Sequence, residues 1–130
     1  MASIVKEFTL AASACEVWDA LADFGALHTR LVPGFVTDTR LDGDARIVTF
    51  ANGAVAREQL VTRDAARRRL VYTVASERLA HHSACAQVFE APGGRARFLW
   101  ITDVLPNEIA PHIDGQMDAG AEAIKRQFGG

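Results

Sequence analysis

Three polar side chains stand in segments where apolar residues alternate along the chain: Glu58, Tyr72 and His82. A carboxylate withdrawn from water could accept a proton, hold a ligand hydroxyl or, if protonated, act as an acid. An imidazole can give or take a proton near neutral pH, and a buried phenol hydroxyl needs a hydrogen-bond partner. Such a mixture of groups is typical of a specific ligand pocket, and it also suits proton transfer.

Two adjacent histidines fall in one strand-like segment. The side chains of His81 and His82 leave opposite faces of such a strand, so they cannot chelate one metal ion together, and we expect no metal site. His82 shares its face with the apolar residues Ala84, Ala86 and Val88, which makes it the better candidate for a cavity. The alternative is a histidine at the rim, bonded to the backbone.

The face that carries Glu58 depends on a hairpin turn. A two-residue Asn52-Gly53 turn predicts that Ile47 lies opposite Glu58 and that Thr49 lies opposite Ala56, on one face with Leu60. The other face would carry Val48, Phe50, Arg57, Gln59 and Val61. The pattern barely separates the two faces, so Glu58 could equally be an exposed residue paired with a neighbouring arginine.

The first part of the chain predicts one strand and two helices. Alternation over residues 3–10 predicts a strand. Ser13 followed by Glu16 is typical of a helix cap, so we expect a helix over residues 14–23. Leu27 and Leu31 predict a short second helix, which ends at the Pro33-Gly34 turn.

The rest of the chain predicts a meander of about six strands and a long helix. Strands are expected from Phe35 to the Asp42-Gly43 turn and over residues 45–51, 54–63, 70–75, 79–90 and 95–104, with residues 76–78 forming one of the turns. A helical stripe then comprises Ile109, Ile113, Met117, Ala121, Ile124 and Phe128. We expect an α+β fold in which this helix covers the apolar face of a curved sheet. The small or pliable residues Met117, Gly120 and Ala121 leave room for a cavity there.

Composition and charge exclude several classes of function. The chain has 130 residues, which predicts a single domain over residues 1–130, and its net charge of -2 is unsuited to binding nucleic acid. The cluster of Arg63, Arg67, Arg68 and Arg69 is expected to form a solvated turn. No apolar run approaches the roughly 18 residues of a membrane span, so we expect no integral membrane segment. Lys6 and Glu7 interrupt the N-terminal apolar stretch that an export signal needs, so we expect a cytoplasmic protein, and we expect it to be monomeric or homodimeric. The spacing of Cys15 and Cys85 indicates neither a zinc site nor a redox pair, and no glycine-rich loop predicts a nucleotide, so we expect no cofactor.

The sequence resembles the SRPBCC superfamily, which includes polyketide cyclases/dehydrases and lipid-transfer proteins. The residues that carry the resemblance are Ala12, Val17-Trp18, Ala22-Asp23-Phe24, Pro33-Gly34, Gly43, Arg46, Asn52-Gly53, Glu58, Leu60, Tyr72, Gly93-Gly94 and Trp100. The resemblance implies the helix-grip fold of the birch-pollen allergen and the plant abscisic acid receptors, with an apolar small molecule held between the sheet and the long helix. It also favours Glu58 pointing into the cavity. Many relatives have a Trp shortly before Pro-Gly, where this chain has residues 28–31, so a more polar pocket entrance is expected.

The sequence gives two conflicting predictions for the face of the strand on which Trp100 lies. A two-residue Gly93-Gly94 turn would place Leu99 opposite Val88 and turn Trp100 outward, whereas the charged Arg95 and Arg97 indicate that Trp100 faces inward, which we favour. The candidate catalytic residues are Glu58 and His82. The candidate ligand contacts are Tyr72, Phe98, Trp100, Ile47, Leu60, Ala84, Ile113, Met117, Leu31 and Phe35.

Three functions remain open at this stage. The first is binding of a small, mostly apolar ligand such as a lipid, a polyketide or an aromatic metabolite. The second is a cyclase-like or dehydratase-like reaction in which Glu58 and His82 transfer protons. The third is a protein-interaction module, which predicts a filled core and an exposed apolar patch.

Overall fold

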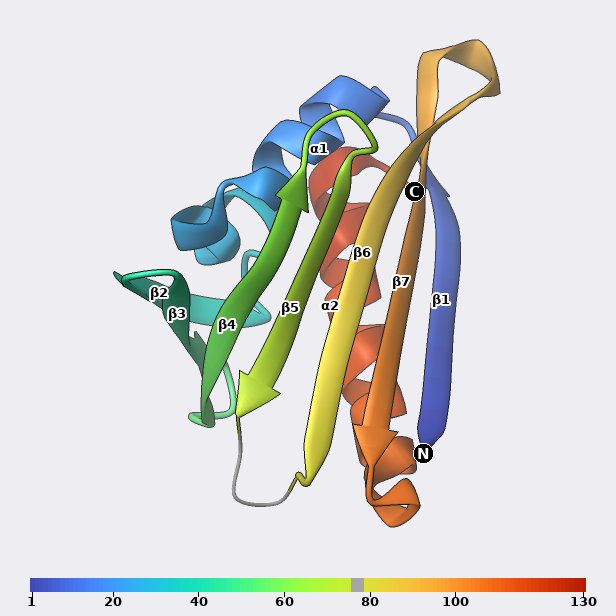
Figure 1. The fold of residues 1–130 in the computed structure, drawn as a ribbon. Coiled ribbons are helices and arrows are strands. Elements are labelled where there is room, and N and C mark those ends of the chain that lie inside the picture. Colours follow the sequence, from blue (N-terminus) through green and yellow to red (C-terminus); the bar gives the residue numbers. More distant parts are fainter. Residues whose placement is uncertain (76–78) are drawn as a thin grey trace.

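The structure is a computed structural model that describes residues 1–75 and 79–130. The turn expected at residues 76–78 lies outside the described residues. Within them, seven antiparallel strands form one curved sheet in the order β1-β7-β6-β5-β4-β3-β2, and the long helix α2 packs along one face of it (Figure 1). The strands are β1 (Ala2–Leu10), β2 (Val36–Asp42), β3 (Ala45–Phe50), β4 (Val55–Asp64), β5 (Arg69–Ala75), β6 (His81–Ala91) and β7 (Arg95–Leu105).

Short helices between β1 and β2 close one end of the sheet (Figure 1). Ser13 caps helix α1 (Ala14–Ala22) by accepting a hydrogen bond from the Glu16 backbone N–H at 3.2 Å, as the sequence predicts. The expected second helix is present as the 3-10 turn η1 (Phe24–Ala26) followed by the π-helical turn η2 (Leu27–Leu31). The predicted helix-grip architecture is thereby confirmed.

The hairpin between β3 and β4 differs from the prediction by one residue. Its loop has three residues, because the Phe50 backbone N–H bonds to the Ala54 carbonyl across the turn. Gly53 adopts a φ of 88°, the left-handed conformation that such a loop needs at its last position. Arg46, not Ile47, therefore lies opposite Glu58, and the predicted register is wrong. Glu58 faces inward as a result.

A three-residue turn in place of a two-residue turn also determines the orientation of Trp100. The connection between β6 and β7 is the three-residue turn η3 (Pro92–Gly94), so that Val88 pairs with Phe98 and Ala86 pairs with Trp100. Phe98 and Trp100 both lie on the inner face, as the charges of Arg95 and Arg97 indicate.

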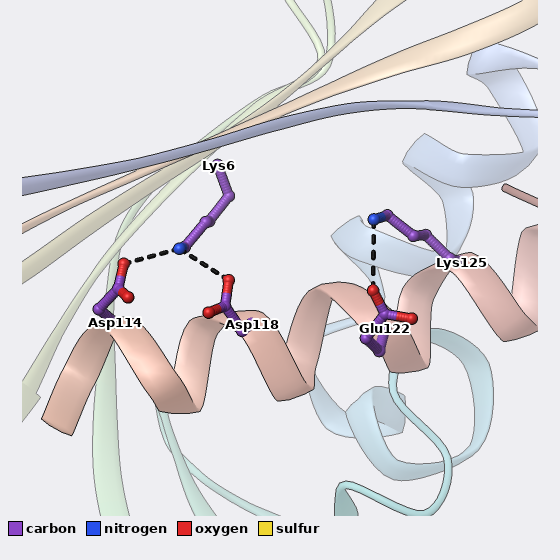
Figure 2. Close-up of polar contacts among 5 residues, drawn as sticks. All are labelled: Lys6, Asp114, Asp118, Glu122 and Lys125. Carbon is purple, nitrogen blue, oxygen red and sulfur yellow. Dashed lines mark hydrogen bonds and ion pairs between the residues drawn. The ribbon is translucent and has the colours of Figure 1, made fainter. Parts of the chain in front are cut away.

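Helix α2 (Ala110–Phe128) follows the 3-10 turn η4 (Asn107–Ile109), and polar contacts fix it to β1 at both ends. Lys6 Nζ lies 2.6 Å from Asp114 Oδ1 and 2.7 Å from Asp118 Oδ1 (Figure 2), and these two carboxylates raise the pKa of the Lys6 ammonium. At the other end of α2, the Gly129 carbonyl accepts a hydrogen bond from the Ala11 backbone N–H. The helix is thus held over the sheet by groups outside the interior.

Gly120 lets α2 approach the sheet closely. A Cβ atom at this position would lie 3.0 Å from Cη2 and 3.1 Å from Cζ3 of Trp100. The sequence predicts that Gly120 leaves space for a cavity, and this detail is wrong, because the Trp100 ring occupies that space. The open volume lies elsewhere between the helix and the sheet.

Candidate functional site

A cavity of about 220 Å³ lies between the inner face of the sheet, helix α2 and the short helices. The sheet, α1, η2, η4 and α2 all contribute side chains to its wall. The lining residues are Leu21, Leu27, Leu31, Val32, Phe35, Val36, Arg46, Phe50, Ala54, Val55, Ala56, Glu58, Tyr72, Val74, Leu79, His82, Ala86, Phe98, Trp100, Thr102, Ile109, His112, Ile113, Gln116, Met117 and Ile124. The interior is therefore hollow, and the wall is mostly apolar with several aromatic rings.

Two small residues lie on the inner face of strand β6, and one of them, Ala86, lines the cavity. Ala84 and Ala86 occupy successive inner-face positions and are both almost fully buried. Ala84 lies between Tyr72 of β5 and Thr102 of β7, and Ala86 lies opposite Trp100. Methyl groups between larger neighbours leave a hollow that a longer side chain would fill.

A buried ion pair closes one side of the cavity. Arg46 is 3% and Glu58 is 6% exposed. Nε of Arg46 donates a hydrogen bond to Glu58 Oε1 at 2.8 Å, and Nη2 lies 2.7 Å from the same oxygen. The guanidinium also lies 3.9 Å above the centre of the Phe24 ring and donates to the Phe24 carbonyl at 3.3 Å. Since each charge has its counterion within the protein, the pair adds no net charge to the cavity.

Tyr72 stands beside this pair on β5. Burial and the nearby Glu58 carboxylate raise the pKa of its hydroxyl, so the phenol is neutral throughout the physiological range. The Arg46 guanidinium lies 5.2 Å from the ring centre and acts in the opposite direction. The nearby Trp100 indole also lowers this pKa, although its N–H has no hydrogen-bond partner among the described residues.

His82 presents a neutral imidazole to the cavity. Burial, together with the charge of the adjacent His81, lowers the pKa of His82 from 6.5 to about 4. Within residues 1–75 and 79–130, no protein group bonds to His82 Nδ1. A neutral imidazole can donate a hydrogen bond through one nitrogen and accept one through the other.

The lowered pKa of His82 predicts a pH dependence of stability. Between about pH 4 and pH 6.5 the unfolded chain binds a proton at this site and the folded protein does not, so the free energy of unfolding should fall as the pH falls. In this pH window, His82 should make the unfolded chain bind up to about one proton more than the folded protein. Urea unfolding of wild type and His82→Gln at pH 7 and pH 5 measures it.

His81→Gln is the matched control for this measurement, because it changes the neighbouring histidine on the opposite face. That variant should keep most of the pH dependence, since burial is the main cause of the shift at His82. An identical pH dependence in wild type and His82→Gln would contradict the assignment.

Most of the sequence-predicted site residues line this one cavity. They are Glu58, His82, Tyr72, Phe98, Trp100, Ile113, Met117, Leu31 and Phe35. Ile47 does not, because the corrected register pairs it with Arg57 and turns it to the other face. Leu60 packs against the core and Ala84 is buried behind larger neighbours, and neither lines the cavity.

The sequence interpretation gave no role to several polar residues of the wall. Arg46 was missed because the two-residue turn placed it on the other face from Glu58; a three-residue loop ending in Gly would have paired the two opposite charges. Thr102 was missed although it shares strand parity with Trp100. His112 and Gln116 lie next to the predicted stripe positions Ile113 and Met117 on α2.

The second helix contributes apolar side chains to the cavity wall. Leu27 and Leu31 of this segment line the cavity, whereas Thr29 and Arg30 are exposed. Arg30 instead pairs with Asp23 at 3.0 Å. Helical spacing turns the two leucines inward and Thr29 and Arg30 outward, while His28 is half-buried.

In the part of the chain that the structure describes, no group of three or more His, Cys, Asp or Glu side chains could hold a metal ion. No helix within the described ranges is long and apolar enough to cross a membrane.

Several solved structures share the fold of this protein. An uncharacterised protein from Bacillus thuringiensis superposes with a TM-score of 0.87 at 18% identity, over 98% of both chains. A START superfamily protein from Mycobacterium smegmatis gives a TM-score of 0.78 at 12% identity, covering 97% of this chain and 96% of its own. Norcoclaurine synthase from Thalictrum flavum, in complex with dopamine and hydroxybenzaldehyde, gives 0.71 at 21% identity, covering 96% and 84%. The fold is the helix-grip fold of the START/SRPBCC superfamily, as the sequence resemblance implies.

The family follows from the sequence itself. The profile of the polyketide cyclase/dehydrase and lipid transport family matches residues 1–129, and the chain belongs to this family. No curated protein matches the sequence.

Proposed function

We propose that this protein binds a compact, mostly apolar small molecule in the cavity between the sheet and α2. The observation that carries the proposal is a hollow interior whose apolar wall also presents a few polar groups, which is the composition expected of a specific ligand site. Burial of apolar ligand surface, at roughly 25 cal/mol per Å², would drive binding. The family and the fold are compatible with this function.

The size of the cavity favours a compact ligand over a long-chain lipid. Its volume of about 220 Å³ lies below the ~300–1,000 Å³ of sites for drug-sized ligands. Aromatic side chains, including Phe35, Phe50 and Phe98, favour a ring-containing molecule, because offset or edge-to-face contacts add to the burial of area. The complex of norcoclaurine synthase with dopamine and hydroxybenzaldehyde is an example of this fold with compact aromatic molecules.

The test is a set of neutral aromatic compounds and long-chain lipids, measured by the melting temperature of the protein. Compact aromatics should raise the melting temperature in a concentration-dependent way, because a ligand that binds only the folded state stabilises it. Lipids with long chains should have a much smaller effect. A set in which no compact aromatic raises the melting temperature would contradict the proposal.

Proton-transfer catalysis is the second candidate function. It is favoured by the free Nδ1 of His82 within the cavity, among the residues described. Two features place it behind simple binding. The lowered pKa makes His82 a weak base at neutral pH, and Glu58 Oε1 already accepts a hydrogen bond from Arg46 and is ion-paired with it. An interaction module with a filled core is disfavoured because the interior is hollow.

A further inference from the structure

Three polar atoms in the cavity wall have no partner among the described protein groups. They are His82 Nδ1, Trp100 Nε1 and Thr102 Oγ1, and each belongs to a residue that lines the cavity. Buried polar atoms are nearly always hydrogen-bonded, since an unpaired one costs about 1–3 kcal/mol. Three such atoms in one wall therefore call for a specific explanation.

The three residues are close neighbours on the inner face of β6 and β7. Trp100 and Thr102 occupy successive inner positions of β7, which are separated by about 7 Å along a strand. His82 lies opposite Val104, so that it is a diagonal neighbour of Thr102, at about 7–8 Å. Thr102 lies between Trp100 and His82 in this arrangement, and we name the three groups the polar strip.

The chemistry of the polar strip restricts what it can bind. The Trp100 indole N–H is only a donor, so its partner must be an acceptor such as an oxygen atom. The Thr102 hydroxyl and the neutral imidazole of His82 can each donate or accept. A ligand that satisfies the strip thus carries an acceptor oxygen and has room for a second polar group.

The electrostatics of the wall restrict the charge of the ligand. The Arg46 guanidinium, which would otherwise attract a carboxylate or a phosphate, is already paired with Glu58. His82 is neutral at pH 7 and Tyr72 is an uncharged phenol, while His112 lies at the exposed end of the wall. An anionic ligand would lose its hydration without gaining a counterion, which is costly in a buried site.

We propose that His82, Trp100 and Thr102 form a subsite for the carbonyl or hydroxyl oxygen of an uncharged, ring-containing ligand, with Trp100 as the hydrogen-bond donor. This inference rests on the proposed function of the cavity, and it adds the chemical class of the ligand. It assigns the apolar remainder of the molecule to the aromatic and aliphatic wall.

Three probes of the same shape test the proposal: acetylnaphthalene, isopropenylnaphthalene and naphthoate. All three have the same ring system. Acetylnaphthalene carries a neutral oxygen acceptor, isopropenylnaphthalene carries no acceptor, and naphthoate carries a negative charge. We expect acetylnaphthalene to bind about 10- to 100-fold more tightly than isopropenylnaphthalene, because the hydrocarbon leaves the strip unpaired. Naphthoate should bind more weakly than acetylnaphthalene. In NMR spectra, the indole N–H resonance of Trp100 should move to lower field with acetylnaphthalene only.

Two substitutions remove the proposed contacts, and the second of them leaves the shape of the wall almost unchanged. Trp100→Phe removes the N–H donor, and Thr102→Val removes the hydroxyl. Each should weaken acetylnaphthalene about 5- to 30-fold and leave isopropenylnaphthalene unchanged. Thr39→Val is the matched control, since the Thr39 hydroxyl is also buried and unpartnered within the described ranges but lies outside the cavity wall. That control should leave the affinity for both probes unchanged.

The outcomes separate this inference from the proposed function. Equal binding of the ketone and the hydrocarbon, or tightest binding of naphthoate, would overturn the polar strip and leave the cavity as an apolar or anion-binding site. A failure of all three probes to bind would overturn the proposed function and this inference with it. If Thr39→Val weakened the ketone as much as Thr102→Val, the assignment to the strip would also be wrong.

Discussion

Replacement of Arg46 by methionine is expected to lower the free energy of unfolding by about 3–5 kcal/mol. The substitution leaves the Glu58 carboxylate buried without its counterion, and it removes the contact of the guanidinium with Phe24. Glu58→Gln should have an effect of similar size, because it leaves the guanidinium of Arg46 buried and only partly bonded. Urea unfolding at constant pH measures both.

The double variant Arg46→Met/Glu58→Leu distinguishes a buried pair from two independent residues. It should recover most of the lost stability, since apolar side chains can replace a buried ion pair at little cost. Arg57→Met is the matched control on the same hairpin: Arg57 pairs with Asp42 at 2.6 Å, but the two side chains are 47% and 63% exposed. It should change stability by less than about 1 kcal/mol. Additive effects of the two buried substitutions would show that the pair is not coupled.

The order and type of the elements could be predicted from the sequence because they depend on local patterns. The Ser13 cap, the alternation in the strands and the stripe on α2 each extend over several residues, so they tolerate an error of one position. The fold follows from this order, because only the long helix can cover the apolar face of the sheet.

The register of each hairpin could not be predicted from those patterns. Asn52-Gly53 fits both a two-residue turn and the last two positions of a three-residue loop, and the choice moves every side chain to the opposite face. In β7, the positions of Arg95 and Arg97 correctly predicted the orientation of Trp100. Two charges on one face indicate that this face points to solvent, so the face with Trp100 points inward. In β3, Arg46 would have misled that argument, since it is buried with a partner.

The positions of the polar groups in the cavity could not be predicted from the sequence either. Thr102 lies in a strand where a threonine is ordinary on either face, so nothing in its neighbours marks an unpartnered hydroxyl. Gly120 was associated with open space, yet its missing side chain admits the Trp100 ring. Both facts depend on how α2 and β7 meet across the interior.

Replacement of Ala86 by phenylalanine is expected to weaken the binding of acetylnaphthalene by at least about 100-fold. Ala86 lines the cavity and its Cβ lies on the inner face of β6, so a benzyl group there would occupy the volume that the ligand needs. Overpacking costs about 1–3 kcal/mol in a filled core, and the open space should keep the cost at the lower end of this range.

Cys85→Phe is the matched control for this substitution. It adds the same ring to the adjacent residue of the same strand, but on the outer face, where Cys85 is partly exposed. The Cys85→Phe variant should bind acetylnaphthalene as tightly as the wild type does. Similar affinities of Ala86→Phe and Cys85→Phe would place the ligand outside the cavity.

The most direct measurement is an NMR titration of the isotope-labelled protein with acetylnaphthalene, followed by intermolecular NOEs. We predict NOEs from the naphthalene protons to the Met117 methyl group, to Ile113 and to the Trp100 ring, and their loss in Ala86→Phe. Saturable binding with NOEs only to residues of the outer face, or no binding at millimolar probe, would contradict a ligand site between the sheet and α2.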